Sequence, residues 1–559
     1  MKIALAQINT TVGDFAGNTR KILDYAARAA DLGADLAVFP ELAVCGYSPA
    51  DFLEKAAFIA RADEANAEIA TWTGGVGRLS ILCGTVLQTA SAVGKQVRNV
   101  AALLSHGKLQ FVQQKMLLPF YDVFDEQRYF EPAAEQALTE IGGEPLAITI
   151  CEDAWNDKGF WPRQMYTIDP VQRLMEQWDA QPGDLAHKQR IILNISASPF
   201  WQGKCATRQS MLSALAQRHG AFVAMANQVG GNDSLVFDGS SLAIRPDGQV
   251  IKRGASFVED LIFFDTNDHA VAVADSPPDE IAATWDALVL GTRDYVRKCG
   301  FSKALVGLSG GIDSALVAAI AVEALGSENV VGVGMPTEYS SLGSIEDARK
   351  VAKNLGVRFE LLPIHEVFGK FQDLLEPLFA GTPFGLAEEN LQPRIRGTVL
   401  MALSNKFGAL VLTTGNKSEM STGYCTLYGD MVGALAVIGD VMKMRVYALS
   451  RYANRSREII PRETMEKPPS AELRPEQRDT DSLPAYEVLD PILEAYVERY
   501  CSAEEIAEEQ GMEVGLVRSV LQLVERSEYK RQQAAPVLKV TRKSFGMGRR
   551  FPIAVKVQV

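Results

Sequence analysis

A glycine-rich stretch in the second half of the chain has the residue types that binding a phosphate chain requires. Residues 307–314 read Gly-Leu-Ser-Gly-Gly-Ile-Asp-Ser and join an apolar run to a helical pattern. Paired glycines let a backbone approach an anion closely, and the N–H groups at the start of a helix attract negative charge. Asp313 adds a carboxylate suited to Mg²⁺. Because the chain contains no Gly-x-x-x-x-Gly-Lys-Ser/Thr, this stretch is not a Walker P-loop.

Two residues in the first half stand where an α/β fold places its reactive groups. Glu41, within Phe-Pro-Glu-Leu, follows an apolar run, and Cys151 ends the apolar run 147–150. Reactive side chains of such folds collect at the carboxyl ends of strands. A rigidly held thiol can act as a nucleophile. Taken alone, Cys151 is better explained as a small buried hydrophobe, and Glu41 as a surface acid.

Both candidate sites depend on alternating strands and helices. In the first half, strands are predicted at 3–8, 36–39, 147–151, 191–195, 221–226 and 261–264, with a helix at 19–32. In the second half, strands are predicted at 303–308, 330–335, 359–363 and 409–414, with a helix at 314–325. Continuous apolar strands suit sheets that are covered on both faces. The second half therefore predicts a doubly wound α/β domain with a parallel sheet.

Composition shifts divide the chain into two domains. The Pro-rich acidic stretch 275–279 predicts a linker at 271–285 between a domain at 1–270 and a domain at 286–559. Residues 455–481 hold 13 charged residues and 4 prolines, with almost no apolar periodicity. Such a segment buries too little surface to offset its ordering entropy, so we expect a mobile loop.

Three motifs in order resemble the nitrilase superfamily of carbon–nitrogen hydrolases over about residues 1–270. They are Phe-Pro-Glu-Leu around Glu41, Lys-Met-Leu-Leu-Pro-Phe-Tyr from Lys115, and Ile-Cys-Glu-Asp around Cys151. The resemblance implies a four-layer α-β-β-α sandwich and a Glu-Lys-Cys triad. Glu41 would be the general base for Cys151, which is a weak nucleophile as a free thiol, and Lys115 would stabilise the oxyanion. Glu126 resembles an auxiliary glutamate of the family.

A further stretch of the first half resembles the glutamine-holding segment of the glutaminase branch. It comprises residues 194–200, Asn-Ile-Ser-Ala-Ser-Pro-Phe, with a lysine six residues after the second serine. This implies that Ser198 and Lys204 contact the polar groups of glutamine and that Tyr121 lines the same pocket. The alternative is a strand end followed by an ordinary Ser-Pro turn.

The stretch 307–314 resembles the phosphate loop of the N-type ATP pyrophosphatases, which split ATP between its α and β phosphates. Residues 389–396, 413–419 and 422–430 resemble NAD synthetases, and the whole chain resembles the glutamine-dependent branch of that family. One departure is Pro393, which predicts that its helix begins near that point, since proline is tolerated near a helix start.

This second resemblance implies roles for particular residues. The ATP-binding set is Gly307, Leu308, Ser309, Gly310, Gly311, Ile312, Asp313, Ser314, Thr414, Lys443 and Ser470. The deamido-NAD-binding set is Asn390, Arg394, Glu419, Tyr424, Cys425, Thr426, Leu427 and Lys530. Asp313 and Glu419 would hold Mg²⁺.

The two resemblances together imply glutamine-hydrolysing NAD⁺ synthesis from deamido-NAD⁺ and ATP. The nicotinate carboxylate would be adenylated, and ammonia released at Cys151 would be delivered internally to displace AMP. One alternative is a synthetase that uses free ammonia beside an inactive amidase scaffold, which the intact triad disfavours. Others are an amidotransferase that makes GMP or asparagine, and a sulfur-transferring tRNA enzyme. The latter would need a basic surface and paired cysteines.

Composition limits the partners and the compartment. The 559 residues carry a net charge of −13, which argues against nucleic acid as a partner. No apolar run approaches the ~18 residues of a membrane span. Seven scattered cysteines without a CxxC pair favour a reducing cytoplasm. We therefore expect small-molecule substrates only, and the family suggests a homo-oligomer, either a dimer of synthetase domains or an octamer.

Overall fold

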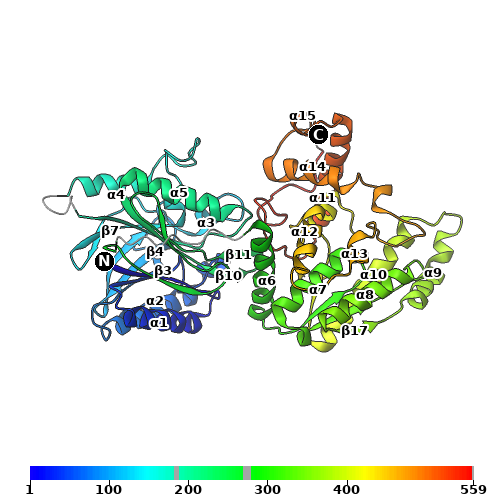
Figure 1. The fold of residues 1–559 in the computed structure, drawn as a ribbon, viewed down its shortest axis with the longest axis horizontal. Coiled ribbons are helices and arrows are strands. Elements are labelled where there is room, and N and C mark those ends of the chain that lie inside the picture. The colour runs from blue at the N-terminus through cyan, green and yellow to red at the C-terminus, as the bar shows by residue number, and fades with distance from the viewer. Residues whose placement is uncertain (182–187, 269–278, 557–559) are drawn as a thin grey trace. The chain divides into compact units, whose positions relative to one another are not determined.

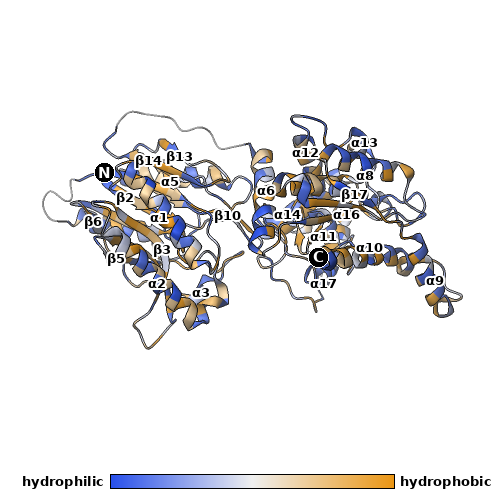
Figure 2. Cartoon of the chain, turned by 90° about the horizontal axis from the view of Figure 1, so that it is seen from below, coloured by the Kyte–Doolittle hydropathy of each residue, from blue (hydrophilic) through white to orange (hydrophobic). Residues whose placement is uncertain are grey.

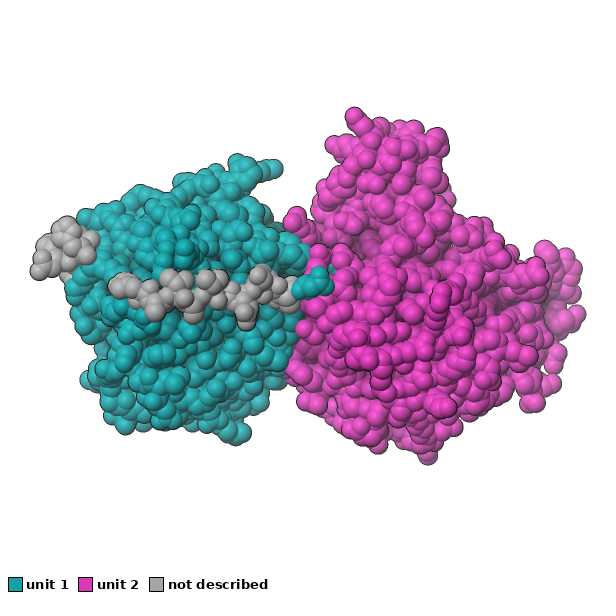
Figure 3. Space-filling view, in the orientation of Figure 1, with its two compact units in different colours: residues 1–232, 236–279 teal, residues 233–235, 280–559 magenta. Residues whose placement is uncertain are grey.

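The computed structural model describes residues 1–181, 188–268 and 279–556. The chain forms two compact units, Met1–Asn232 with Val236–Asp279, and Asp233–Leu235 with Glu280–Val559, which Figure 3 colours separately. The main division, between Asp279 and Glu280, falls inside the predicted linker 271–285, whose Pro-rich centre lies outside the described residues except for Asp279. The domain limits 1–270 and 286–559 stay a prediction. Within the described ranges, no helix is both long and apolar enough to cross a membrane.

Unit 1 contains two six-stranded sheets. The first has the order β14-β1-β2-β3-β4-β5 and the second the order β13-β12-β9-β8-β7-β6. The first comprises β1 (Lys2–Gln7), β2 (Leu36–Val38), β3 (Ser80–Gln88), β4 (Val97–Ser105), β5 (Lys108–Gln114) and β14 (Asp260–Asp265). The second comprises β6 (Thr139–Ile141), β7 (Glu144–Ile150), β8 (Arg190–Ser196), β9 (Ala221–Asn227), β12 (Leu242–Ile244) and β13 (Val250–Arg253). A two-stranded sheet joins β10 (Val229–Asn232) and β11 (Leu235–Asp238).

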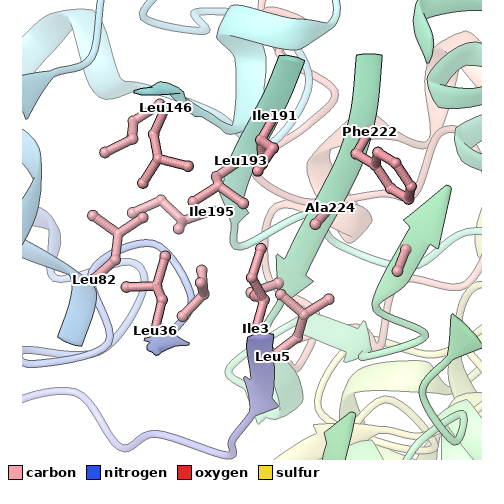
Figure 4. Packing of buried hydrophobic residues seen from close by; sticks show 14 of the residues in the cluster. Ile3, Leu5, Leu36, Leu82, Leu146, Ile191, Leu193, Ile195, Phe222 and Ala224 are labelled. Atoms are coloured by element: carbon pink, nitrogen blue, oxygen red, sulfur yellow. The ribbon is translucent and has the colours of Figure 1, made fainter. Parts of the chain in front are cut away.

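The two sheets of unit 1 face each other across a buried apolar core. Ile3, Leu36 and Leu82 from the first sheet and Ile148 and Leu193 from the second belong to one cluster of side chains, shown in part in Figure 4. Helices α1 (Phe15–Asp31) and α2 (Ala56–Thr73) cover the first sheet, while α4 (Pro170–Asp179) and α5 (Lys204–His219) cover the second (Figure 1). The predicted four-layer α-β-β-α sandwich is confirmed.

Helix α1 shows how local sequence forms these layers. The Asp14 side chain accepts a hydrogen bond from the Gly17 N–H at 2.9 Å, which caps the first turn. Its buried residues Phe15, Ile22, Ala26 and Ala29 recur at helical spacing, so a single stripe faces the sheet.

Unit 2 is built on a parallel sheet of order β17-β16-β15-β18-β19. The strands are β15 (Ala304–Gly307), β16 (Val330–Gly334), β17 (Arg358–Leu361), β18 (Leu410–Thr413) and β19 (Leu435–Ala436). The chain order reverses between β15 and β18, which is the point where doubly wound folds bind ligands. The predicted doubly wound sheet is confirmed, and Figure 2 shows hydrophobic residues along the strands of each unit.

The helices of unit 2 lie between Glu280 and Arg531. They are α6 (Glu280–Lys298), α7 (Ile312–Leu325), α8 (Leu342–Leu355), α9 (His365–Phe379), α10 (Leu386–Phe407), α11 (Lys417–Thr422), α12 (Lys443–Ala453), α13 (Arg462–Glu466), α14 (Tyr486–Arg499), α15 (Ala503–Gln510), α16 (Val514–Arg526) and α17 (Glu528–Arg531). Helix α6 begins inside the predicted linker.

The prediction that a helix begins near Pro393 is wrong. Pro393 lies inside α10, seven residues after its first residue, Leu386. Proline costs a helix one backbone hydrogen bond at such a position. Tertiary packing accounts for the difference, because Pro393 is buried and its ring lies so close to Gly429 that a Cβ there would be 2.9 Å away.

Residues 455–481, predicted to be a mobile loop, contain α13 and the short 3-10 helix Asp479–Asp481. Polar contacts connect the stretch to the rest of unit 2. The Glu472 carboxylate accepts hydrogen bonds from the hydroxyls of Ser344 at 2.7 Å and Ser341 at 3.1 Å. Polar contacts of this kind do not depend on apolar residues at regular spacing, so the hydrophobic pattern of the sequence does not predict them. The mobility of the stretch stays a prediction.

Candidate active sites

The thiol of Cys151 is held at the end of a buried strand by a rigid turn. Cys151 directly follows β7, opens the 3-10 helix Cys151–Ala154 and has a φ of 44°, a strained value for a residue with a side chain. The buried Asp153 carboxylate accepts the N–H groups of Ile150 at 3.1 Å, Met116 at 3.0 Å and Leu117 at 2.8 Å. One side chain therefore connects the Cys151 turn to the segment that carries Lys115.

Glu41, Lys115 and Glu126 form a buried charge cluster. The Lys115 Nζ lies 2.6 Å from Glu41 Oε1 and 2.7 Å from Glu126 Oε2. Burial alone would lower the pKa of Lys115, but the Glu126 and Glu41 carboxylates raise it well above its ordinary value. Lys115 therefore stays a cation. Burial, reinforced by Glu41, raises the pKa of Cys151 well above that of a free thiol, so the resting side chain is a thiol that needs a base.

Two further groups fix the Glu41 carboxylate. Asn99 Nδ2 on β4 donates to Glu41 Oε1 at 2.7 Å, and the Ala197 N–H donates to Glu41 Oε2 at 3.0 Å. The Asn99 carbonyl also accepts the Lys115 N–H at 2.9 Å. Asn99, on a strand that is paired on both sides, thus positions both Glu41 and Lys115.

The predicted glutamine-binding residues connect to the same region. The Ser198 N–H donates a hydrogen bond to Asn227 Oδ1 at 2.9 Å. Ser198 directly follows Ala197, whose N–H contacts Glu41. Tyr121 donates its hydroxyl to the Glu152 carboxylate at 2.9 Å. Lys204 is buried at the start of α5, with its Nζ 5.4 Å from the centre of the Trp155 ring. The structure thus places Tyr121 against Glu152, the residue after Cys151.

Unit 2 has a cavity of about 300 Å³ at the reversal of strand order. Of the predicted ATP-binding residues, Gly307, Leu308, Ser309, Gly311, Ile312, Asp313, Ser314, Thr414, Lys443 and Ser470 line it. Gly310 does not line it but shapes the turn: its φ is 85°, and a Cβ there would lie 2.1 Å from the Ser344 carbonyl oxygen. Only glycine fits at that position.

The carboxylates of this cavity suit a Mg²⁺ ion bound together with substrate phosphates. Lys443 pairs with Asp313, and Asn416 Nδ2 donates to Asp313 Oδ1 at 2.9 Å. Asn416 also caps α11, accepting the Glu419 N–H at 3.0 Å. Burial, reinforced by Asp313, raises the pKa of Glu419 well above its ordinary value, a repulsion that a divalent cation would relieve. Among the described residues, no group of three metal-binding side chains occurs. Mg²⁺ is often bound by one or two carboxylates together with phosphate oxygens.

The predicted deamido-NAD-binding residues divide into two groups. Glu419, Tyr424 and Cys425 line the cavity. Asn390, Arg394, Thr426, Leu427 and Lys530 do not line it but meet at the loop that follows α11. Thr426 donates to Asn390 at 2.7 Å, Arg394 Nε donates to the Leu427 carbonyl at 3.2 Å, and Lys530 Nζ donates to the Gly423 and Cys425 carbonyls at 2.7 Å. These contacts order the loop that presents Tyr424 and Cys425.

Several residues of the two sites were not predicted. Glu152 and Asp153 directly follow the candidate nucleophile, so their position in the sequence could have predicted that they belong to the site. Asn416 begins the pattern Asn-Lys-Ser-Glu, which is a capping-box signature for the helix that carries Glu419. Nothing in the sequence around Asn99 predicts its role, because its partner Glu41 is 58 residues away.

Comparison with known proteins agrees with both sites. The carbon-nitrogen hydrolase family model matches residues 2–164 and 185–274, and the NAD synthase family model matches residues 284–534. A glutamine-dependent NAD(+) synthetase of Synechocystis sp. is 48% identical over 99% of this chain and 98% of its own length. The chain belongs to the glutamine-dependent NAD(+) synthetase family. A family member from Thermotoga maritima is 42% identical over 99% of this chain and 98% of its own length.

A solved structure supports this membership. The glutamine-dependent NAD⁺ synthetase of Acinetobacter baumannii, determined with ADP, has a TM-score of 0.75 and 38% identity, and covers 99% of this chain and 98% of its own. The resemblance inferred from the sequence is therefore confirmed for both halves of the chain.

Proposed function

We propose that this chain is a carbon–nitrogen ligase of NAD biosynthesis that uses glutamine as its amide donor. Deamido-NAD⁺, ATP, L-glutamine and water would be converted to NAD⁺, AMP, diphosphate and L-glutamate. The observation that carries the proposal is that one chain of this family holds two clusters of residues suited to the two half-reactions. One is the buried Glu41–Lys115–Cys151 cluster, and the other is the cavity lined by the 307–314 loop.

The first site would release ammonia from glutamine. Glu41 accepts the Cys151 thiol proton as the sulfur attacks the amide carbon. Lys115 and the N–H that follows Cys151 stabilise the oxyanion, and one such donor typically contributes ~2.7–4 kcal/mol. The C–N bond then breaks and ammonia leaves with the proton. Water cleaves the thioester to give glutamate and the free thiol.

The second site would activate deamido-NAD⁺. The N–H groups of the 307–314 loop and the Lys443 ammonium hold the phosphates of ATP while the nicotinate carboxylate attacks the α-phosphorus. Asp313 and Glu419 would hold Mg²⁺, which supplies charge neutralisation where diphosphate leaves. Ammonia then attacks the adenylated carboxyl carbon, and AMP departs. Tyr424 and Cys425, presented by the ordered loop, would contact the dinucleotide.

A product assay tests the proposal against the ammonia-dependent alternative. Purified chain is incubated with deamido-NAD⁺, ATP and Mg²⁺, with either glutamine or ammonium as the nitrogen source. NAD⁺ should form in both reactions, with glutamate only in the first. NAD⁺ from ammonium alone would instead support an inactive amidase scaffold, and no NAD⁺ from either source would reject the function.

Glutamate release should rise with pH through about 7, and this rise should be smaller in Glu126→Gln. Part of it should remain, because burial also raises the pKa of Asp153, beside the Cys151 turn, to about 7. Burial raises the pKa of Glu126 to about 7, against the opposing effect of Lys115. Below that pH the protonated Glu126 no longer balances the charge of Lys115 beside the nucleophile, and we expect attack by Cys151 to be slower. The glutamine variant stays neutral at every pH. Rates between about pH 5.5 and 8.5 measure the effect, and the same rise in both proteins would contradict it.

The assembly is proposed to be a dimer of synthetase domains or an octamer. Val367, Phe371, Leu374 and Leu378 on α9 are 46%, 41%, 71% and 79% exposed and form one stripe at helical spacing. A second copy of the chain would cover such a stripe. Leu374→Asp should therefore lower the particle mass measured by light scattering, while Asp373→Asn on the same helix should not. An unchanged mass for Leu374→Asp would contradict pairing through α9.

A reducing cytoplasm is the proposed location. The cysteines are all free in the structure, as expected where thiols stay reduced.

A further inference from the structure

Two helices carry groups that are proposed to meet ATP in the second site, and their first turns are joined by a buried hydroxyl. Helix α11 begins at Lys417 and carries Glu419, while α12 begins at Lys443. Ser418 is fully buried, and its Oγ accepts the Lys443 N–H at 3.0 Å. The start of one helix is therefore hydrogen-bonded to the start of the other.

Asp490, a residue of α14 that is 6% exposed, completes this junction. Its Oδ1 accepts the Ser418 hydroxyl at 2.6 Å, and its Oδ2 accepts the Met444 N–H at 2.8 Å. One carboxylate thus accepts a hydrogen bond from each of the two helices. Four residues earlier on α14, the centre of the Tyr486 ring lies 5.4 Å from the Lys443 Nζ. Neither Ser418 nor Asp490 lines the cavity, so their contacts act on the site through the helices.

A second buried contact fixes α11 to α14. The Lys417 Nζ lies 2.7 Å from Glu498 Oε1 and 2.9 Å from Asp440 Oδ1, and it also donates to the Thr541 hydroxyl at 2.7 Å. Glu498 lies on α14 about two helical turns after Asp490. Two separate points on α14 therefore contact consecutive residues of α11, which opposes both sliding and rotation of that short helix.

The residues that Asp490 holds are next to, or the same as, those proposed to act on ATP. Ser418 directly precedes Glu419, and Met444 directly follows Lys443. We propose that Asp490 is a positioning residue of the second site, which sets the spacing between Glu419 and Lys443. These two groups must meet different parts of one substrate complex at the same time, and a displacement of about 1 Å can lower a rate on the order of 10²-fold. This assignment rests on the NAD⁺ synthesis proposed above.

The alternative is that Asp490 only stabilises the fold of unit 2. Loss of a purely structural contact lowers the melting temperature, but each molecule that stays folded keeps the native rate. Loss of a positioning contact lowers the rate of the folded molecules themselves. Since Asp490 acts on Lys443 through Ser418, the effects of removing each contact on this rate should also be non-additive.

Diphosphate release by the full-length chain tests the assignment, with saturating deamido-NAD⁺, ATP, Mg²⁺ and ammonium, and with the folded fraction taken from circular dichroism at the assay temperature. Asp490→Asn keeps the shape of the side chain but has one acceptor oxygen in place of two. This variant and Ser418→Ala should each lower kcat per folded molecule by about 10- to 100-fold, and the double variant should fall little further. Glu494→Gln, which neutralises an exposed carboxylate on α14, is the matched control and should keep the native kcat.

The outcomes separate this assignment from the proposed function. If the wild-type chain makes NAD⁺ and Asp490→Asn keeps its kcat per folded molecule, only the Asp490 assignment fails. Effects of the two substitutions that simply multiply in the double variant would also overturn it. If the wild-type chain makes no NAD⁺ from either nitrogen source, the proposed function fails and the assignment falls with it. Should Asp490→Asn not fold, Ser418→Ala must lower kcat by itself, and a native kcat for Ser418→Ala overturns the assignment.

Discussion

Cys151→Ala should abolish NAD⁺ formation from glutamine and leave NAD⁺ formation from ammonium unchanged. Only the thiol can form the covalent intermediate at this site, and removing a catalytic nucleophile typically lowers a rate on the order of 10⁴–10⁶-fold. The small methyl group fits the buried turn, because Asp153 still accepts the N–H groups of Ile150, Met116 and Leu117. The cavity proposed to bind ATP lies in the other unit and keeps all its lining residues.

The measurement compares NAD⁺ formed from glutamine and from ammonium by the same protein preparation. Cys299→Ala, which removes an exposed thiol, is the control and should keep both activities. If the folded Cys151→Ala variant lost both activities equally, two separate sites could not explain the chain. If it kept glutamine-dependent synthesis, another residue would have to be the nucleophile.

The strand ends that carry Glu41, Cys151 and the 307–314 loop were predictable because each follows a short apolar run. Buried strands of this kind are continuous in sequence, so local pattern is enough to place them. Contacts that cross between strands were not predictable from one sequence. Asn99, Ala197 and Glu41 meet although they are 58 and 156 residues apart.

Tertiary contacts also overrode local expectations in the second unit. Pro393 favours a helix start, yet packing against Gly429 keeps it inside α10. Arg394 and Lys530 are expected to contact the dinucleotide, which stays a prediction. In the structure Arg394 Nε and Lys530 Nζ also donate to carbonyls of the loop after α11. A cation that orders a loop and a cation that binds a ligand look the same in sequence. Their distinction depends on which acceptor the folded chain brings within reach.

Asp313→Asn should stop NAD⁺ formation from either nitrogen source, because the lost charge acts before ammonia enters. The Asp313 carboxylate pairs with Lys443 and accepts from Asn416, so an asparagine keeps the shape of the site but not its charge. Loss of charge neutralisation where diphosphate departs should raise the activation free energy by several kcal/mol, which lowers the rate on the order of 10²–10⁴-fold. Diphosphate release dependent on deamido-NAD⁺ measures the step directly.

Titration with Mg²⁺ then separates the two functions that Asp313 combines. If Asp313 holds the ion, the variant should need more Mg²⁺ for half-maximal diphosphate release, because one of two carboxylates is gone. If Asp313 acts only by orienting Lys443, the maximal rate should fall while the Mg²⁺ dependence stays that of the native chain. Asp373→Asn, an exposed carboxylate on α9, should change neither quantity. If Asp313→Asn released diphosphate at the native rate at ordinary Mg²⁺, Asp313 would not be part of the site. Glu419 would then be the only carboxylate of the two left to hold Mg²⁺ beside the phosphates.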